Sequence, residues 1–192
     1  MKLGCGIFLD LFKGDPSFFL TYFDHLEIQD FVLPDNLDYY AGEIVKQYQK
    51  LLKDFRGTLS LHGPFRELFP SSMDRQVQQL AHRRFARALQ LGKELGCRVM
   101  VVHSCYNPLL KYPEYADNWL ENTTRFWEKF LPFCRREKIK IALENIWDPN
   151  PELINRLLDT FDDSFFRACL DTGHAHLSSK LTFRAVLAAG QP

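Results

Sequence analysis

Residues 165–176 read FFRACLDTGHAH, an apolar run that leads directly into a carboxylate, a glycine and two imidazoles. The apolar half, residues 165–170, has the composition of a buried strand. A backbone turn at the end of such a strand can hold oxygen and nitrogen ligands close together. We therefore predict a strand whose polar end, from Asp171 to His176, carries chemistry.

The same pattern recurs upstream, because several short apolar runs end at a polar residue. Three of these runs stop at His62, at His103 and at Glu144 followed by Asn145. Runs that are apolar on both faces are typical of strands in a parallel sheet covered by helices. The five upstream strands that we predict are residues 3–9, 25–29, 58–61, 98–102 and 140–143.

Longer amphipathic segments separate these runs, and their apolar residues recur at helical spacing. Asp15 with Pro16 has the residue types of a helix N-cap and first turn, and Asn150 with Pro151 repeats that signal. The other predicted helices cover residues 38–55, which Gly57 closes, 74–95, 119–133 with a kink or break at Pro132, and 181–189.

Six strand–helix units in succession predict a parallel α/β sheet. Two architectures fit this order, an open doubly wound sheet and a TIM (β/α)8 barrel. No GxGxxG sequence follows the first strand, which disfavours a dinucleotide-binding sheet. The polar residues fall at the C-terminal ends of successive strands, and in a barrel these ends converge on one mouth. We therefore predict a TIM-type barrel.

Eight units of such a barrel usually need about 250 residues, and the chain has 192. We expect one domain over residues 1–192 with about six βα units, an incomplete barrel that lacks the last two. An unclosed barrel exposes two strand edges. Three explanations stay open: two units have been lost, another chain completes the sheet, or the six-stranded sheet is open. In the second case a homodimer would cover the open edge.

The amino-acid composition limits the classes of partner that the chain is expected to bind. Acidic and basic residues number 24 each, which gives zero net charge and argues against a nucleic-acid or anionic-membrane surface. No apolar stretch reaches the roughly 18 residues that a membrane span needs. The five cysteines have no CxxC spacing, which favours reduced thiols in a cytoplasmic protein.

The polar strand ends together form a mixed nitrogen and oxygen ligand set. Such a set suits Zn²⁺, Mn²⁺ or another first-row divalent ion. Each residue alone has an ordinary explanation, such as a histidine that fills the core or a carboxylate that caps a helix. Repetition on four successive strands favours a site. The predicted metal ligands are His62, His103, Glu144, Asp171 and His174.

Two further residues are candidates for contact with a substrate. Asn145 adjoins Glu144, and in the loop its amide could orient a ligand or a substrate hydroxyl. Arg66 follows His62 closely and is a candidate for binding a substrate anion such as a phosphate.

Four motifs also carry a family resemblance: LHGPF at 61–65, VVHS at 101–104, ALEN at 142–145 and LDTGH at 170–174. In these motifs the chain resembles the xylose-isomerase-like TIM barrel superfamily. That superfamily includes sugar and sugar-phosphate isomerases and epimerases, and the zinc-dependent apurinic endonucleases of AP endonuclease family 2. The resemblance covers essentially the whole chain as the first six units of the barrel.

The resemblance implies different roles in its two branches. In the isomerase branch, Glu144 and Asp171 would bind the metal, carboxylates would shuttle a proton next to a carbonyl, and His174 would contact substrate. In the endonuclease branch, His62, His103 and Glu144 would hold one zinc, Glu144 would bridge to a second with Asp171, and His174 would serve a third. Both branches complete the site from strands seven and eight.

Three hypotheses for function follow. The first is a metal-dependent isomerase or epimerase of a small sugar or sugar phosphate, with Glu144 as the catalytic residue. The second is a zinc-dependent phosphoester hydrolase of the AP endonuclease kind. Zero net charge favours the first over the second. The third is a truncated, non-catalytic protein that binds or assembles through its open sheet edge.

Overall fold

The structure, a computed structural model, describes residues 2–161 and 163–178, so the helix predicted over 181–189 lies outside the described residues. Every strand predicted from the sequence is present, with ends that differ by a few residues. The strands are β1 (Gly4–Ile7), β2 (His25–Ile28), β3 (Thr58–His62), β4 (Val99–His103), β5 (Lys140–Glu144) and β6 (Phe166–Cys169).

Helices follow each strand. The first half of the chain contains α1 (Leu9–Gly14), α2 (Pro16–Tyr22), the 3₁₀ turn η1 (Asp30–Val32), the π-helical turn η2 (Asn36–Tyr40), α3 (Ala41–Leu51) and α4 (Arg75–Glu94). The second half contains α5 (Tyr115–Glu128), α6 (Leu131–Glu137), α7 (Glu152–Phe161) and α8 (Thr172–Ser178).

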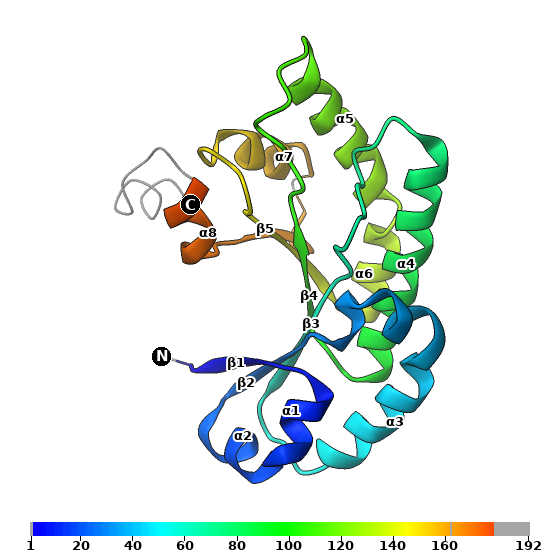
Figure 1. Cartoon of the computed structure of the whole chain (residues 1–192), viewed down its shortest axis with the longest axis vertical. Coiled ribbons are helices and arrows are strands. Elements are labelled where there is room, and N and C mark those ends of the chain that lie inside the picture. The colour runs from blue at the N-terminus through cyan, green and yellow to red at the C-terminus, as the bar shows by residue number, and fades with distance from the viewer. Residues whose placement is uncertain (1, 162, 179–192) are drawn as a thin grey trace.

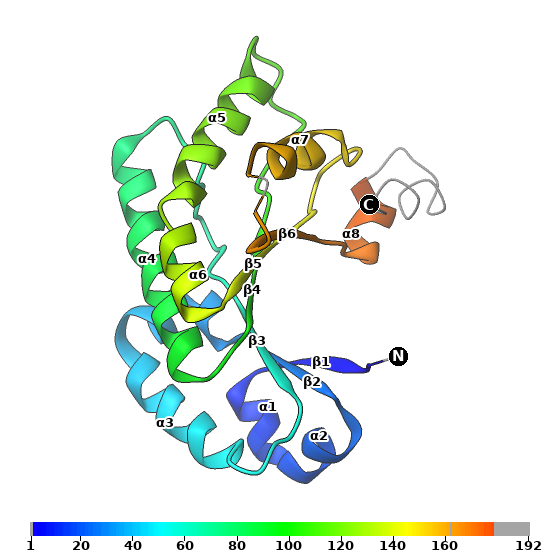
Figure 2. The same cartoon turned by 180° about the vertical axis from the view of Figure 1, so that it is seen from behind.

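The six strands form one parallel sheet in the order β1-β2-β3-β4-β5-β6. The sheet bends strongly, and the helices α3 to α6 cover its outer, convex side (Figures 1 and 2). The free ends of β1 and α8 point to the same open side of the molecule. Within residues 2–161 and 163–178, β1 and β6 do not pair with each other. The sequence prediction of six consecutive parallel strands is confirmed.

The register of the strands decides which side chains face the inside of the bend. His62 lies beside Val101, and His103 lies beside Glu144. Because side chains alternate between the two faces of a sheet, all four of these residues point to the same face. The intervening residues, such as Leu61, point outward and pack under the helices with almost no exposed surface.

The core between the sheet and the outer helices is rich in aromatic side chains, many of them from the segment 119–133. Trp119 and Trp127 on α5 are 1% and 0% exposed. Trp127 contacts Phe85 of α4 edge to face, with ring centroids 4.9 Å apart. The predicted break at Pro132 is confirmed, because α5 ends at Glu128 and the proline lies in the first turn of α6.

The C-terminal end of the helix expected over residues 38–55 and the role of Gly57 were predicted wrongly. The helix expected over 38–55 is a π turn followed by α3, which ends at Leu51. Gly57 therefore does not close it. A Cβ atom at Gly57 would lie 2.4 Å from the carbonyl oxygen of Asp24, so this glycine permits two backbone segments to approach closely.

The structure also contains two short helices that the sequence patterns did not reveal, α1 and α8. The α8 helix begins at Thr172, inside the segment interpreted as a polar strand end. The Asp171 side chain accepts a hydrogen bond from the His174 backbone N–H at 2.7 Å and so caps this helix. Across the described residues, no helix has the length and apolar character that a bilayer crossing demands.

Candidate metal centre

A cavity of about 460 Å³ lies at the C-terminal ends of the strands, inside the bend of the sheet. This volume is typical of a site for a small ligand. The cavity includes all five predicted metal ligands and Arg66. Its lining residues are Phe8, Glu27, Gln29, Val32, His62, Phe65, Arg66, Val101, His103, Glu144, Cys169, Leu170, Asp171 and His174.

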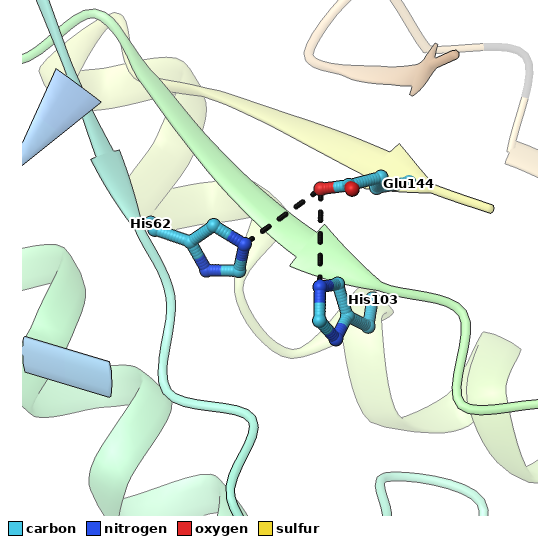
Figure 3. Close-up of side chains that lie close together, drawn as sticks. All are labelled: His62, His103 and Glu144. Atoms are coloured by element: carbon cyan, nitrogen blue, oxygen red, sulfur yellow. Dashed lines mark ion pairs between the residues drawn. The ribbon is translucent and has the colours of Figure 1, made fainter. Parts of the chain in front are cut away.

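One oxygen of Glu144 is the point on which two imidazoles converge. Its Oε2 atom lies 3.7 Å from His62 Nε2 and 3.9 Å from His103 Nε2 (Figure 3). The three side chains come from β3, β4 and β5, and each is at most 9% exposed. They form a group of ligand atoms that could hold a metal ion.

The tautomer of His62 is fixed by its backbone neighbour. His62 Nδ1 lies 2.9 Å from the Gly63 carbonyl oxygen. Because a carbonyl only accepts hydrogen bonds, Nδ1 carries the hydrogen, and Nε2 of the neutral ring keeps its lone pair. That lone pair belongs to the nitrogen nearer Glu144. A histidine that donates from one nitrogen to a backbone carbonyl is oriented to bind metal through the other.

The two imidazoles have opposite pKa shifts. Burial lowers the pKa of His103 to about 4, and the neighbouring His62 adds to this effect. Burial acts on His62 in the same direction, but the Glu144 carboxylate and the Gly63 carbonyl outweigh it and raise the pKa of His62. His103 is therefore neutral near pH 7, the form that binds metals.

A second group of ligand atoms shares Glu144 and contains Asp171 and His174. His174 Nδ1 lies 3.3 Å from Glu144 Oε1 and 3.8 Å from Asp171 Oδ2. The same nitrogen lies 2.9 Å from the Asn145 carbonyl oxygen, so it carries the hydrogen. In this arrangement Nε2 is the nitrogen of His174 that is left to bind a metal or a substrate.

Asp171 is partly exposed and ionises readily. Burial would raise its pKa, but the hydrogen bond from the His174 backbone and the charge of that imidazole lower it below the ordinary value. A carboxylate that is ionised at neutral pH can bind a cation.

The amide of Asn145 is occupied by the backbone of Asp171. It donates from Nδ2 to the Asp171 carbonyl and accepts from the Asp171 N–H, both at 2.9 Å. Asn145 does not line the cavity. Of the two roles foreseen for this amide, the geometry favours orienting Asp171 over contact with a substrate hydroxyl.

Arg66 lies at the exposed rim of the cavity, and among the described residues its guanidinium has no ion-pair partner. Glu27 and Gln29 also line the cavity, and sequence reasoning did not identify them. A signal for them was present: His25, Glu27 and Gln29 alternate with buried Leu26 and Ile28 along the second strand. That alternation places His25 and Glu27 on the inner face of β2 and Gln29 just beyond its end.

Known proteins with similar sequences identify the family. A family model described as xylose isomerase-like TIM barrel matches residues 22–189. This chain belongs to the xylose isomerase-like TIM barrel family. The resemblance inferred from four short motifs is therefore confirmed. Among its archaeal relatives, the uncharacterised protein MJ1311 of Methanocaldococcus jannaschii is 26% identical over 153 residues, 76% of this chain and 51% of that protein. The chain spans about half the length of the archaeal relatives that it matches.

Solved structures place the fold in the same family. The TTHB071 protein from Thermus thermophilus, soaked with ZnCl₂, is 26% identical with a TM-score of 0.79, and the match covers 100% of this chain and 75% of that one. A D-tagatose 3-epimerase-like protein is 23% identical with a TM-score of 0.76, covering 100% and 72%. At that identity the likeness establishes the fold alone. The predicted TIM-barrel architecture is confirmed by these structures.

Proposed function

We propose that this chain is a metal-dependent isomerase or epimerase that acts on a small sugar or sugar phosphate by removing a proton next to a carbonyl. The observation that carries the proposal is the position of Glu144. One oxygen of its carboxylate faces two imidazoles and the other faces His174, within a cavity of about 460 Å³. Sugar epimerases among the structural relatives support the same reaction class.

The three side chains His62, His103 and Glu144 fit a divalent ion. Zinc ligands at about 2.0–2.1 Å in a tetrahedral arrangement lie about 3.3 Å apart. The nitrogen-to-oxygen distances of 3.7 and 3.9 Å are near this spacing and longer than hydrogen bonds. A histidine and carboxylate set suits zinc or manganese, and a zinc-soaked relative supports zinc.

A divalent ion held by His62, His103 and Glu144 would supply Lewis acidity, which polarises a carbonyl oxygen and acidifies the adjacent C–H bond. Glu144 would accept the proton on Oε1, the oxygen that faces away from the two imidazoles, and a proton returned to a substrate carbon would complete the isomerisation. His174 accepts a hydrogen bond from a substrate hydroxyl at Nε2, because its Nδ1–H is held by the Asn145 carbonyl. Arg66 binds a phosphate of the substrate at the rim of the cavity.

Solvent exchange tests this proposal without knowledge of the substrate. We expect the chain loaded with Mn²⁺ or Zn²⁺ to introduce deuterium from D₂O next to the carbonyl of at least one member of a panel of ketohexoses and their phosphate esters. Glu144→Gln is expected to lower this exchange by roughly 10²–10⁴-fold, because the proton acceptor is lost. Proton NMR of the recovered sugars measures the exchange.

The control variant is Glu152→Gln, which changes a carboxylate after the same strand but outside the cavity. It should exchange deuterium at the wild-type rate. A metal-loaded wild-type chain that exchanges nothing across the panel would contradict the proposal. So would a Glu144→Gln variant with the wild-type rate.

Zinc affinity should depend on pH through His62. Its pKa is raised above the ordinary value of 6.5, so a proton occupies the ring and competes with zinc as the pH falls through that region. The pKa of His103, lowered to about 4, keeps this ring free of protons over the same range. We expect affinity to fall about tenfold per pH unit between roughly pH 6.5 and 5. Competition with a zinc indicator measures it, and a constant affinity over this range would contradict the ligand assignment.

A second candidate function is zinc-dependent phosphoester hydrolysis. It is favoured by the two ligand groups that share Glu144, because two neighbouring metal ions suit phosphoester chemistry. Release of phosphate or nitrophenol from phosphomonoesters and phosphodiesters by a zinc-loaded chain that exchanges no sugar deuterium would select this function. The predicted homodimer, cytoplasmic location and single domain over residues 1–192 stay predictions.

A further inference from the structure

Asp148 is a buried carboxylate outside the candidate metal centre, and it connects two of the loops that follow the ligand strands. It is 5% exposed and lies after β5. Its Oδ2 atom accepts a hydrogen bond from Ser104 Oγ at 2.6 Å and another from the Ile146 N–H at 2.9 Å. We propose that Asp148 is a positioning residue that holds His103 and Glu144 at the spacing a metal ion requires. This inference rests on the metal site proposed above.

The connection reaches both ligands through short lengths of backbone. Ser104 directly follows His103, and Ile146 is the second residue after Glu144. Ser104 is also held at its other polar groups, because its N–H donates to the Glu144 carbonyl at 2.9 Å and its own carbonyl accepts from Trp119 Nε1 at 3.2 Å. With its hydroxyl bound to Asp148 and its backbone groups bound to Glu144 and Trp119, Ser104 leaves the adjacent His103 little freedom to move.

A local turn alone does not explain the hydrogen bonds and the burial of the Asp148 side chain. The bond to Ile146 spans two residues, as in many turns, but the bond to Ser104 spans 44. The other carboxylate oxygen, Oδ1, is buried and has no hydrogen-bond partner among the described residues. Burying a carboxylate with one unsatisfied oxygen is costly. The buried carboxylate is best explained by its hydrogen bond to Ser104, which adds a side-chain link to the backbone link between the same two segments.

Asp30 offers a matched comparison in the same chain. It is also 5% exposed, and it also accepts from one backbone N–H, that of Leu9 at 3.0 Å, and one hydroxyl, that of Tyr48 at 2.5 Å. It joins the loops after β1 and β2 and contacts none of the proposed ligands. Asp30 and Asp148 therefore share a structural role, but only Asp148 is hydrogen-bonded to a residue that directly follows a proposed metal ligand.

The test compares zinc affinity with thermal stability in the 192-residue chain. We expect Asp148→Ala to lower zinc affinity about 10–100-fold, the usual effect of losing a group that orients a metal ligand. Asp30→Ala should lower the melting temperature about as much as Asp148→Ala does, and it should leave zinc affinity unchanged. Asp148→Asn should restore affinity to within a few-fold of wild type, because the amide oxygen can accept both hydrogen bonds. Calorimetric titration with zinc chloride and thermal unfolding supply the two readouts.

Equal zinc affinity in wild type and Asp148→Ala would overturn the inference, as would an equal loss in Asp30→Ala. If Asp148→Ala does not fold, Ser104→Ala removes the long-range bond together with a 3.5 Å hydrogen bond from the Tyr106 N–H, and unchanged zinc affinity in that variant would overturn the inference. Failure of the wild-type chain to take up zinc would refute the proposed metal site and this inference together. Zinc uptake by the wild-type chain with unchanged affinity in Asp148→Ala would instead refute this inference alone, so the two failures are distinguishable.

Discussion

Replacing His103 with asparagine should lower the zinc affinity of this chain by at least about 100-fold, more than the loss of a group that only orients a ligand. His103 Nε2 and His62 Nε2 face the same oxygen of Glu144, at 3.9 and 3.7 Å. Asparagine keeps some polarity but cannot place a nitrogen lone pair at that point. Competition with a zinc indicator at about pH 7.5 measures the loss.

The control for this prediction is His82→Asn. His82 lies on α4, on the outer side of the sheet, with its ring 4.8 Å from that of Phe130. It is remote from the cavity, so zinc affinity should be unchanged. His62→Asn and Glu144→Gln should each resemble His103→Asn, and combining two of these changes should cost less than the sum, because the ligands act on one ion. A His103→Asn variant that binds zinc as tightly as wild type would exclude this residue from the site.

Replacing Trp127 with alanine should destabilise the chain by roughly 3–5 kcal/mol. Trp127 is 0% exposed, and its ring packs against four other aromatic rings, those of Phe85, Phe126, Phe130 and Phe166. Its Nε1 atom has no hydrogen-bond partner among the described residues, so the loss is one of packing and of buried apolar area. Urea unfolding followed by circular dichroism measures the change.

Trp147 supplies the comparison, because it is 45% exposed in the loop after β5. Trp147→Ala should cost less than about 1 kcal/mol. Trp127→Phe should fall between the two, since most of the aromatic volume remains and the unpaired N–H is removed. A loss below about 1 kcal/mol for Trp127→Ala would show that the core does not depend on this contact.

The positions of His62, His103 and Glu144 could be predicted because they depend on simple regularities. Parallel strands in succession bring their C-terminal ends to one edge, and a polar residue that ends an apolar run lies at that edge. The strand register then completes the arrangement, since His103 lies directly beside Glu144. Local sequence and neighbouring strands agree here, and the three side chains lie together at the edge of the sheet, while their role as metal ligands stays a prediction.

The orientation of side chains beyond the strands could not be predicted. The sequence shows that Asn145 follows Glu144, but only the folded chain shows that its amide binds the backbone of Asp171, 26 residues away. The α8 helix was missed for a related reason. An aspartate that caps a helix and an aspartate that binds a metal look identical in sequence, and Asp171, predicted as a metal ligand, has the geometry of a helix cap.

Glu27 and Gln29 escaped notice because the second strand has few apolar residues. The polar residues that indicated a site stand at the ends of apolar runs, whereas β2 carries polar side chains along the face that points into the bend. In a bent sheet whose inner face forms a cavity, alternation is a better criterion than continuous hydrophobicity. The same inward face supplies the imidazoles of β3 and β4.

Anomalous diffraction at the zinc edge, from crystals of the zinc-loaded chain, tests the central claim most directly. We expect one strong peak at about 2.0–2.1 Å from Nε2 of His62 and of His103, and at about 2.0–2.2 Å from a carboxylate oxygen of Glu144. A peak bound elsewhere, or no peak in crystals grown with excess zinc, would contradict the account.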